Sequence, residues 1–196
     1  MKLLSRILIT IGLLLIFSSV VLFVYIFAPV AKVELNYDLN RPRANINQIT
    51  PVDKNFDIVI PKIGANARII PNVDPFNSNV YELALSKGVA QAKGSAFPNQ
   101  TGNMFLFSHS SANLLEATRF NSIFYLLSKL NKADVIYIYY NNTRYKYVVS
   151  GTKLVDPSDV SYLNPKSSVK QLTLMTCWPA GTNYKRLIVI AKSLSK

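Results

Sequence analysis

The chain has 196 residues, of which 49% are hydrophobic, and it carries 22 Lys and Arg against 10 Asp and Glu, a formal net charge of +12. This length accommodates one ordinary domain, so two large domains are not expected. There is one cysteine and one histidine. These counts exclude an intrachain disulfide and a Cys/His zinc site.

Hydrophobic residues are concentrated near the N-terminus. Residues 7–28 contain no charged side chain, and such a run is long enough to cross about 30 Å of hydrocarbon as a helix. A cleavable signal peptide is the alternative, but the run exceeds the usual apolar region of about 7 to 15 residues, and Pro29 makes a poor cleavage site. Because Lys2 and Arg6 precede the run, we expect a single-pass membrane protein with a cytoplasmic N-terminus and an extracellular domain.

Basic residues remain in excess after this anchor. Without Lys2 and Arg6, the other 20 Lys and Arg still face 10 Asp and Glu, which suits an anionic surface such as lipid headgroups or wall polymers. A nucleic-acid partner is not expected, because the domain is predicted to lie outside the cell and no recognition motif is present. A solvated basic face explains the charge equally well.

Composition divides the chain into three parts. Residues 1–30 form the cytoplasmic tip and the anchor, and residues 31–55 form a polar, asparagine-rich stalk that contains Pro42 and Pro51. Residues 56–196 are predicted to form the folded domain.

The folded part alternates short β-type runs with turn signals. Strands are expected at 57–64, 67–71, 103–108, 135–140, 145–155, 172–176 and 186–191. Short helices are expected at 80–87, ending at Gly88 as a left-handed cap, and at 120–130, where apolar residues recur at helical spacing. Asn141 and Asn142 predict a hairpin turn. About seven or eight strands without a βαβ alternation favour a closed or nearly closed antiparallel barrel.

Three chemically competent residues lie at predicted strand ends. Cys177 ends one strand, and Pro179 and Gly181 then reverse the chain, so that a hairpin brings Arg186 beside Cys177. His109 ends another strand and enters a polar loop. The spacing alone does not say whether His109 lies at the same end of the barrel.

These residue types suit acyl transfer through a thiol. A free thiol has a pKa of about 8.5 and needs a neighbouring base or cation to become a nucleophile. An imidazole can activate a thiol and move protons to and from amines, and a guanidinium can stabilise an oxyanion. Taken singly, each residue is more often structural: a buried thiol, a satisfied histidine or a solvated cap.

The amino-acid sequences of several segments resemble the motifs of a known family. Residues 172–177, Leu-Thr-Leu-Met-Thr-Cys, resemble the Thr-Leu-x-Thr-Cys signature of sortases, the membrane-anchored cysteine transpeptidases of mainly Gram-positive bacteria. Further segments resemble that family in the same order along the chain. They are Ile-Pro-Lys-Ile-Gly at 60–64, Lys-Gly-Val-Ala at 87–90, Gly-Asn at 102–103, Ser-His-Ser at 108–110, Cys-Trp-Pro-Ala-Gly-Thr at 177–182 and Arg-Leu-Ile-Val at 186–189.

The resemblance implies an eight-stranded sortase-type barrel, antiparallel or mixed, with about two short helices and one transmembrane helix. It implies that Cys177 attacks the Thr-Gly bond of a Leu-Pro-x-Thr-Gly type sorting signal and forms a thioester. His109 would transfer protons, and Arg186 would stabilise the oxyanion. The implied partners are secreted proteins that carry the signal and an amine on a cell-wall precursor or a pilin.

The resemblance also implies where the substrate binds. Thr176, Ser108, Ser110 and Thr182 are expected to contact it, with the 156–171 connection forming much of the groove wall. The Cys-x-Pro-x-Gly-Thr form favours class D or E. Ser108 stands where glycine is common in the family.

No metal or other cofactor is expected. Asp156 and Asp159 are the only close pair of carboxylates in the 156–171 connection, and calcium requires about six to eight oxygen ligands. Two other functions remain open. One is a hydrolytic cysteine peptidase, in which water resolves the acyl-enzyme, and the other is a non-catalytic anchored barrel that binds anionic wall polymers.

Overall fold

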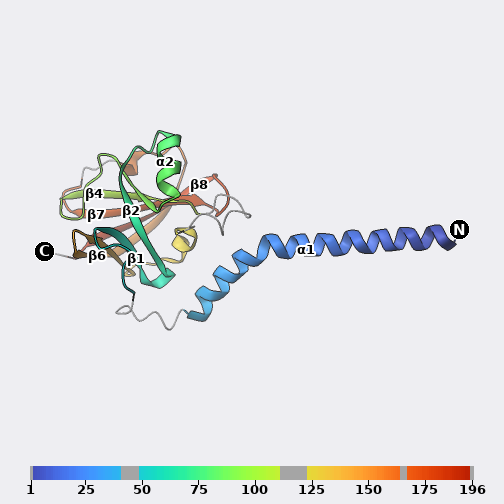
Figure 1. Cartoon of the computed structure of the whole chain (residues 1–196). Helices are drawn as coiled ribbons and strands as arrows, with labels where there is room; N and C mark the ends of the chain where they lie inside the picture. The colour runs from blue at the N-terminus through green and yellow to red at the C-terminus, as the bar shows by residue number, and fades with distance from the viewer. Residues whose placement is uncertain (1, 41–48, 111–122, 164–166, 195–196) are drawn as a thin grey trace.

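A long N-terminal helix precedes a β-barrel in the computed structural model, which describes residues 2–40, 49–110, 123–163 and 167–194 (Figure 1). Within these ranges the strands are β1 (Phe56–Ile60), β2 (Ala65–Val73), β3 (Val89–Ala92), β4 (Gly102–Phe107), β5 (Val135–Tyr140), β6 (Thr143–Val155), β7 (Lys170–Trp178) and β8 (Lys185–Ser193). The helices are α1 (Lys2–Asn40), α2 (Ser78–Leu85) and the short 3₁₀ helices η2 (Pro61–Ile63), η3 (Tyr125–Lys129) and η4 (Ser161–Leu163).

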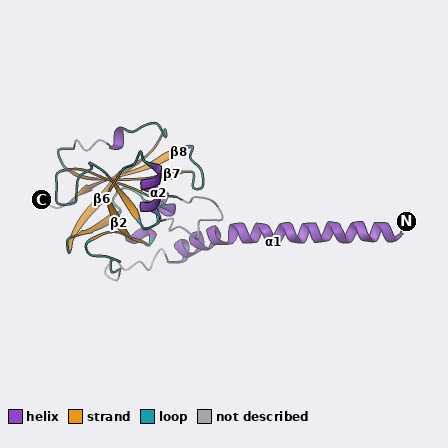
Figure 2. Ribbon diagram, turned by 45° about the horizontal axis from the view of Figure 1, so that its top comes forward, coloured by secondary structure: helices purple, strands orange, loops and turns teal. Residues whose placement is uncertain are grey.

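Helix α1 projects away from the barrel (Figures 1 and 2). Within the described residues, Leu4–Tyr25 is the one segment long and apolar enough to cross a membrane, and none of it is buried against the protein. It is therefore a candidate membrane span, as expected for residues 7–28. The helix continues to Asn40, so the first part of the predicted stalk is helical, and Tyr37 is buried against the barrel.

The sheet closes in the order β1-β2-β3-β4-β7-β8-β6-β5. The β2–β3 and β4–β7 pairs are parallel and the other six are antiparallel. This confirms the predicted eight-stranded mixed barrel with few helices. Strand β3 was not among the predicted segments, because its sequence Val-Ala-Gln-Ala is short and contains residues of low β propensity.

Alternating aliphatic residues from neighbouring strands fill the interior. These core residues include Ile58 and Ile60 of β1, Met104 and Leu106 of β4, and Leu172 and Leu174 of β7. Because successive side chains of a strand point to opposite faces, the intervening residues of each strand face outward. This alternation fixes which side chains reach the outer surface.

Asp53, which precedes β1, contacts Asp57 of this strand. The backbone N–H of Asp53 donates to Asp57 Oδ2 at 3.2 Å, and Asp53 also pairs with Arg68 of β2. Asp57 is fully buried, and among the described residues its Oδ1 has no hydrogen-bond partner. This burial raises the pKa of Asp57 to about 7.

The turn predicted at Asn141 and Asn142 is confirmed. Tyr140 pairs with Thr143, and the two asparagines between them have φ values of 48° and 62°. Asparagine tolerates this left-handed backbone better than most residues, which explains the pair.

Two local predictions for helices are wrong in detail. Helix α2 ends at Leu85, before Gly88, and Gly88 does not adopt a positive φ. A Cβ at Gly88 would lie 2.2 Å from the backbone oxygen of Arg68, so close approach explains this glycine. In the predicted 120–130 helix, residues 120–122 lie outside the described part, and within the described remainder only Tyr125–Lys129 are helical, as the 3₁₀ helix η3.

Candidate active site

Cys177 and Arg186 are neighbours at one end of the barrel. Strands β7 and β8 are antiparallel, and their register pairs Cys177 with Arg186 directly. Both residues are partly buried. The turn between them is closed by Thr182, whose backbone N–H and hydroxyl both donate to the carbonyl of Pro179. The hairpin prediction for this pair is therefore confirmed.

His109 lies at the same end because β4 and β7 run parallel. Phe107 pairs with Met175, and the Ser108 N–H donates to the Met175 carbonyl at 3.2 Å. The segment after β4 therefore stays hydrogen-bonded to β7. The buried hydroxyl of Thr176 donates to the Ser108 carbonyl at 2.8 Å. This parallel register brings the segment that carries His109 alongside Cys177.

A pocket of about 370 Å³ joins these residues. Its floor and walls combine the ends of β4, β7 and β8 with helix α2 and the loop before it. The lining residues are Pro75, Tyr81, Glu82, Leu85, Phe107, Ser108, His109, Met175, Thr176, Cys177, Asn183 and Arg186. The pocket thus places a thiol, an imidazole and a guanidinium around one largely apolar cavity.

Arg186 is held by backbone carbonyls. Its Nη1 donates to the carbonyl of Asn183 at 3.2 Å and to that of Lys185 at 3.3 Å. Among the described residues, no carboxylate forms an ion pair with this guanidinium. Its remaining donors are therefore available to an anionic group in the pocket.

Glu82 of α2 contacts His109, which sequence reasoning did not predict. The distance between His109 Nε2 and Glu82 Oε2 is 3.1 Å, and the side chains are 25% and 56% exposed, respectively. Asn77 caps the helix by accepting a hydrogen bond from the Val80 N–H. No sequence signal links Glu82 to His109, because their proximity depends on how α2 packs on the barrel.

The other predicted site residues divide into two groups. Thr176 and Ser108 line the pocket, whereas Ser110 and Thr182 do not. Ser110 is buried, and among the described residues its hydroxyl has no hydrogen-bond partner. In the 156–171 connection, no described residue lines the pocket; helix α2 and Pro75 supply that wall instead.

The carboxylates of the 156–171 connection have protein partners. Asp156 accepts a hydrogen bond from Lys185 Nζ at 2.8 Å, and Asp159 accepts one from the Ser161 hydroxyl at 2.6 Å. The hydrogen bonds from Ser161 lower the pKa of Asp159. Nowhere in the described residues do three or more His, Cys, Asp or Glu side chains form a group that could hold a metal ion.

The pocket groups match a covalent acyl-transfer chemistry. A thiol can form an acyl intermediate, an imidazole can transfer protons, and a fixed guanidinium can stabilise an oxyanion. The apolar side chains of Leu85, Phe107 and Met175 would accommodate hydrophobic substrate groups.

Comparisons with known proteins identify the family that this chain resembles. A family model described as the Sortase domain matches residues 58–194. The chain is 27% identical over 139 residues to Sortase D of Bacillus subtilis strain 168, an alignment that covers 69% of this chain and 62% of that protein. The chain thus spans less than two thirds of the length of this relative.

Solved structures show the same fold. Sortase A from Corynebacterium diphtheriae, a lid mutant, is 28% identical with a TM-score of 0.59, covering 80% of this chain and 77% of that one. Sortase C-1 from Actinomyces oris is 24% identical with a TM-score of 0.61, covering 86% of each chain. A Sortase D5 transpeptidase from Clostridium perfringens is 23% identical with a TM-score of 0.59, covering 84% and 95%.

Proposed function

The chain belongs to the sortase family of cysteine transpeptidases, and we propose that it cleaves a Leu-Pro-x-Thr-Gly type sorting signal between Thr and Gly. The acyl part is then transferred to an amine of a cell-wall precursor or a pilin. The observation that carries the proposal is the register that pairs Cys177 with Arg186 and brings His109 into the same pocket.

In the first step, Cys177 is the nucleophile. Its thiolate attacks the Thr carbonyl carbon, and Arg186 donates hydrogen bonds to the oxyanion of the tetrahedral intermediate. His109 gives a proton to the Gly nitrogen as the carbon–nitrogen bond breaks. The product of this step is a thioester on Cys177 and a released peptide that begins with Gly.

In the second step, an amine replaces the thiol. His109 takes a proton from the incoming amine, which attacks the thioester carbonyl, and Arg186 again stabilises the oxyanion. The carbon–sulfur bond breaks and a new amide forms. Thr176 and Ser108 would position the signal, since both line the pocket, and Ser110 and Thr182 stay predicted contacts.

The proposed location is the outer face of the cell membrane. The candidate span at Leu4–Tyr25 follows Lys2, and the positive-inside rule then directs the N-terminus to the cytoplasm and the barrel outside. The relative named Sortase D and the Cys-x-Pro-x-Gly-Thr form support membership of class D or E.

A peptide assay tests the proposal. The full chain in detergent is incubated with a quenched Leu-Pro-x-Thr-Gly peptide panel and either triglycine or a lysine amine. We expect cleavage, an acyl adduct on Cys177 by mass spectrometry, and loss of both in Cys177→Ala. If no peptide in the panel is cleaved or captured, the proposed chemistry is wrong.

Product mass separates transpeptidation from hydrolysis. A transpeptidase gives a product extended by the added amine, whereas a hydrolytic peptidase gives the free acid whether or not an amine is present. A free acid alone, with every amine tested, would assign the chain to hydrolysis instead.

A further inference from the structure

The net positive charge of the barrel is concentrated on one half. Strands β7, β8, β6 and β5 are consecutive neighbours in the barrel and contain no Asp or Glu. They do contain seven basic residues: Arg144, Lys146, Lys153, Lys170, Lys185, Arg186 and Lys192. The charged residues of the remaining strands β1, β2, β3 and β4 are one acidic residue, Asp57, and one basic residue, Arg68.

Strand register gathers part of this charge on one outer surface. Arg144 pairs with Tyr139, Lys146 with Tyr137, and Lys192 with Val148. Because Tyr145 and Tyr147 pack on the core, the alternate residues Arg144 and Lys146 point outward. We call the outward residues Tyr137, Tyr139, Arg144, Lys146 and Lys192 the basic face.

The cations of the basic face are exposed and form no ion pair with a described acidic residue. Arg144, Lys146 and Lys192 are all exposed, and none forms an ion pair with a described carboxylate. The Arg144 guanidinium lies 5.1 Å from the centroid of the Tyr137 ring. Cations without acidic partners create a local positive potential that attracts anionic polymers.

The basic face also lies away from both the pocket and the anchor. In the β7–β8 pair, Cys177 and Arg186 mark one end and Gln171 and Lys192 mark the other. Strand β8 ends near the C-terminus, on the side of the barrel farthest from the N-terminus of α1 (Figures 1 and 2). A membrane that holds Leu4–Tyr25 therefore does not face this surface, so the geometry favours a polymer over the lipids of that membrane.

We propose that the basic face binds an extended polyanion with repeated phosphate groups, while the pocket stays open to substrate. Lysine and arginine side chains bind phosphate oxygens through charge-assisted hydrogen bonds, and the three cations extend across the neighbouring strands β6 and β8. The proposal goes beyond the transpeptidase function and rests on it only for the extracellular location.

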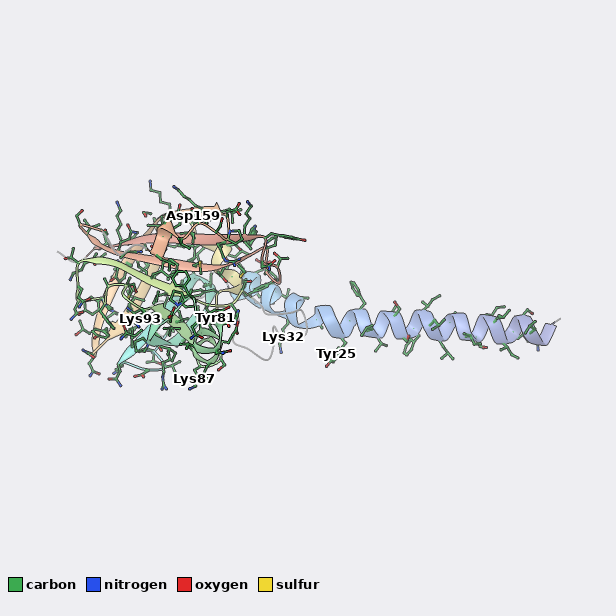
Figure 3. The ribbon with its side chains drawn as sticks, turned by 90° about the horizontal axis from the view of Figure 1, so that it is seen from above. Tyr25, Lys32, Tyr81, Lys87, Lys93 and Asp159 are labelled. Atoms are coloured by element: carbon green, nitrogen blue, oxygen red, sulfur yellow. The ribbon has the colours of Figure 1, made fainter. Side chains whose placement is uncertain are left out.

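The test is a binding measurement on the full chain in nanodiscs of phosphatidylcholine. The probe is poly(glycerol phosphate). One variant combines Arg144→Gln, Lys146→Gln and Lys192→Gln, and a matched control combines Lys54→Gln, Lys87→Gln and Lys93→Gln. The control sites are exposed and lie outside the basic face, and Lys87 and Lys93 are labelled in Figure 3.

We expect the basic-face variant to weaken the Kd about tenfold or more, and the control variant to weaken it less than about twofold. Raising NaCl from about 50 to about 200 mM should weaken binding by the parent chain more steeply than binding by the basic-face variant. Peptide cleavage should be unchanged in both variants, so this test is independent of the proposed catalysis.

Two results would overturn the proposal. Equal losses in both variants would mean that net charge alone attracts the polymer. If the basic-face variant binds the polymer as the parent chain does but loses binding to phosphatidylglycerol vesicles, the face binds a lipid surface instead. Thermal unfolding checks that the triple variants are folded; if the basic-face variant is not, the three single substitutions replace it, each expected to weaken binding about twofold or more.

Discussion

Glu82 gives His109 a partner within the pocket. The residues are 27 positions apart, and the carboxylate Oε2 lies 3.1 Å from the imidazole Nε2. A carboxylate that accepts a hydrogen bond from a ring N–H fixes the orientation of an imidazole. Because the Glu82 side chain is 56% exposed, it contributes little to the stability of the fold. Its effect should therefore be seen in activity.

Replacing Glu82 should lower activity through the position of His109. We expect Glu82→Ala to reduce kcat/KM for peptide cleavage about tenfold, because the ring loses its hydrogen-bond acceptor. Glu82→Gln keeps an acceptor oxygen and should recover most of that loss. Steady-state kinetics on the quenched peptide measure both values.

Lys87→Ala is the matched control, because Lys87 follows the same helix, is exposed, and does not line the pocket. It should retain the parent activity. If Glu82→Ala is as active as this control, or if its melting temperature falls along with its activity, Glu82 does not position His109.

Asp57 should make stability depend on pH. Burial raises the pKa of Asp57 to about 7 from 3.8, so between these values the folded protein binds more protons than the unfolded chain. The free energy of unfolding should then fall as pH rises from about 4 to about 7, by about 2–4 kcal/mol from this group. Asp57→Asn cannot ionise and should lack that part of the decline.

Urea titrations at intervals between pH 4 and pH 8 measure this difference. The parent and Asp57→Asn curves should diverge as pH rises, with the variant gaining relative stability. Parallel curves across the range would show that Asp57 does not titrate with a raised pKa.

At the scale of elements, the sequence predicted most strands and the main turn. Runs of β-branched and aromatic residues identified β5 and β6, and the Asn141-Asn142 pair identified the hairpin between them. Strand β3 was not recognised because its short sequence has low β propensity, and the reason for Gly88 was not predictable because it depends on packing against β2. Local patterns report a strand's own periodicity, but they do not report which distant strand approaches it.

In the candidate site too, contacts between residues close in sequence were predictable, and contacts between distant segments were not. A tight β7–β8 turn makes the proximity of Cys177 and Arg186 a local property, which the sequence predicted. The proximity of His109 requires the parallel β4–β7 pairing between segments far apart in the chain. Glu82 requires in addition the packing of α2, so no spacing rule would have found it.

Gly88 is required where the chain passes from α2 to β3. A Cβ there would lie 2.2 Å from the Arg68 carbonyl oxygen, a backbone atom of β2 that cannot move freely. We expect Gly88→Ala to lower the free energy of unfolding by about 1–3 kcal/mol.

Gly151→Ala is the control for Gly88→Ala. A Cβ at Gly151 would meet no atom within 4 Å, and this residue does not adopt a positive φ. Its stability should change by less than about 1 kcal/mol. Equal effects at the two glycines would contradict the close-approach explanation.

In the whole molecule, the end of α1 is attached to the barrel. Glu34 pairs with Lys129 of η3 at 3.0 Å, and the Lys129 ammonium lies 5.6 Å from the Tyr37 ring centroid. Tyr37 itself is 7% exposed and belongs to the main core cluster. These contacts connect the candidate membrane span to the barrel through a packed helix end, so the first part of the predicted polar stalk is helical.

Removing the Tyr37 ring should therefore destabilise the barrel, although Tyr37 precedes the predicted domain start at residue 56. We expect Tyr37→Ala to lower the free energy of unfolding by about 2–4 kcal/mol, as for other buried aromatic side chains. Leu35→Ala on the same helix removes a side chain that is 59% exposed and should change stability by less than about 0.5 kcal/mol. Urea unfolding of the detergent-solubilised chain, followed by Trp178 fluorescence, compares the two. If both variants match the parent, the barrel is stable without this helix end, and the anchor is joined to it only by a tether.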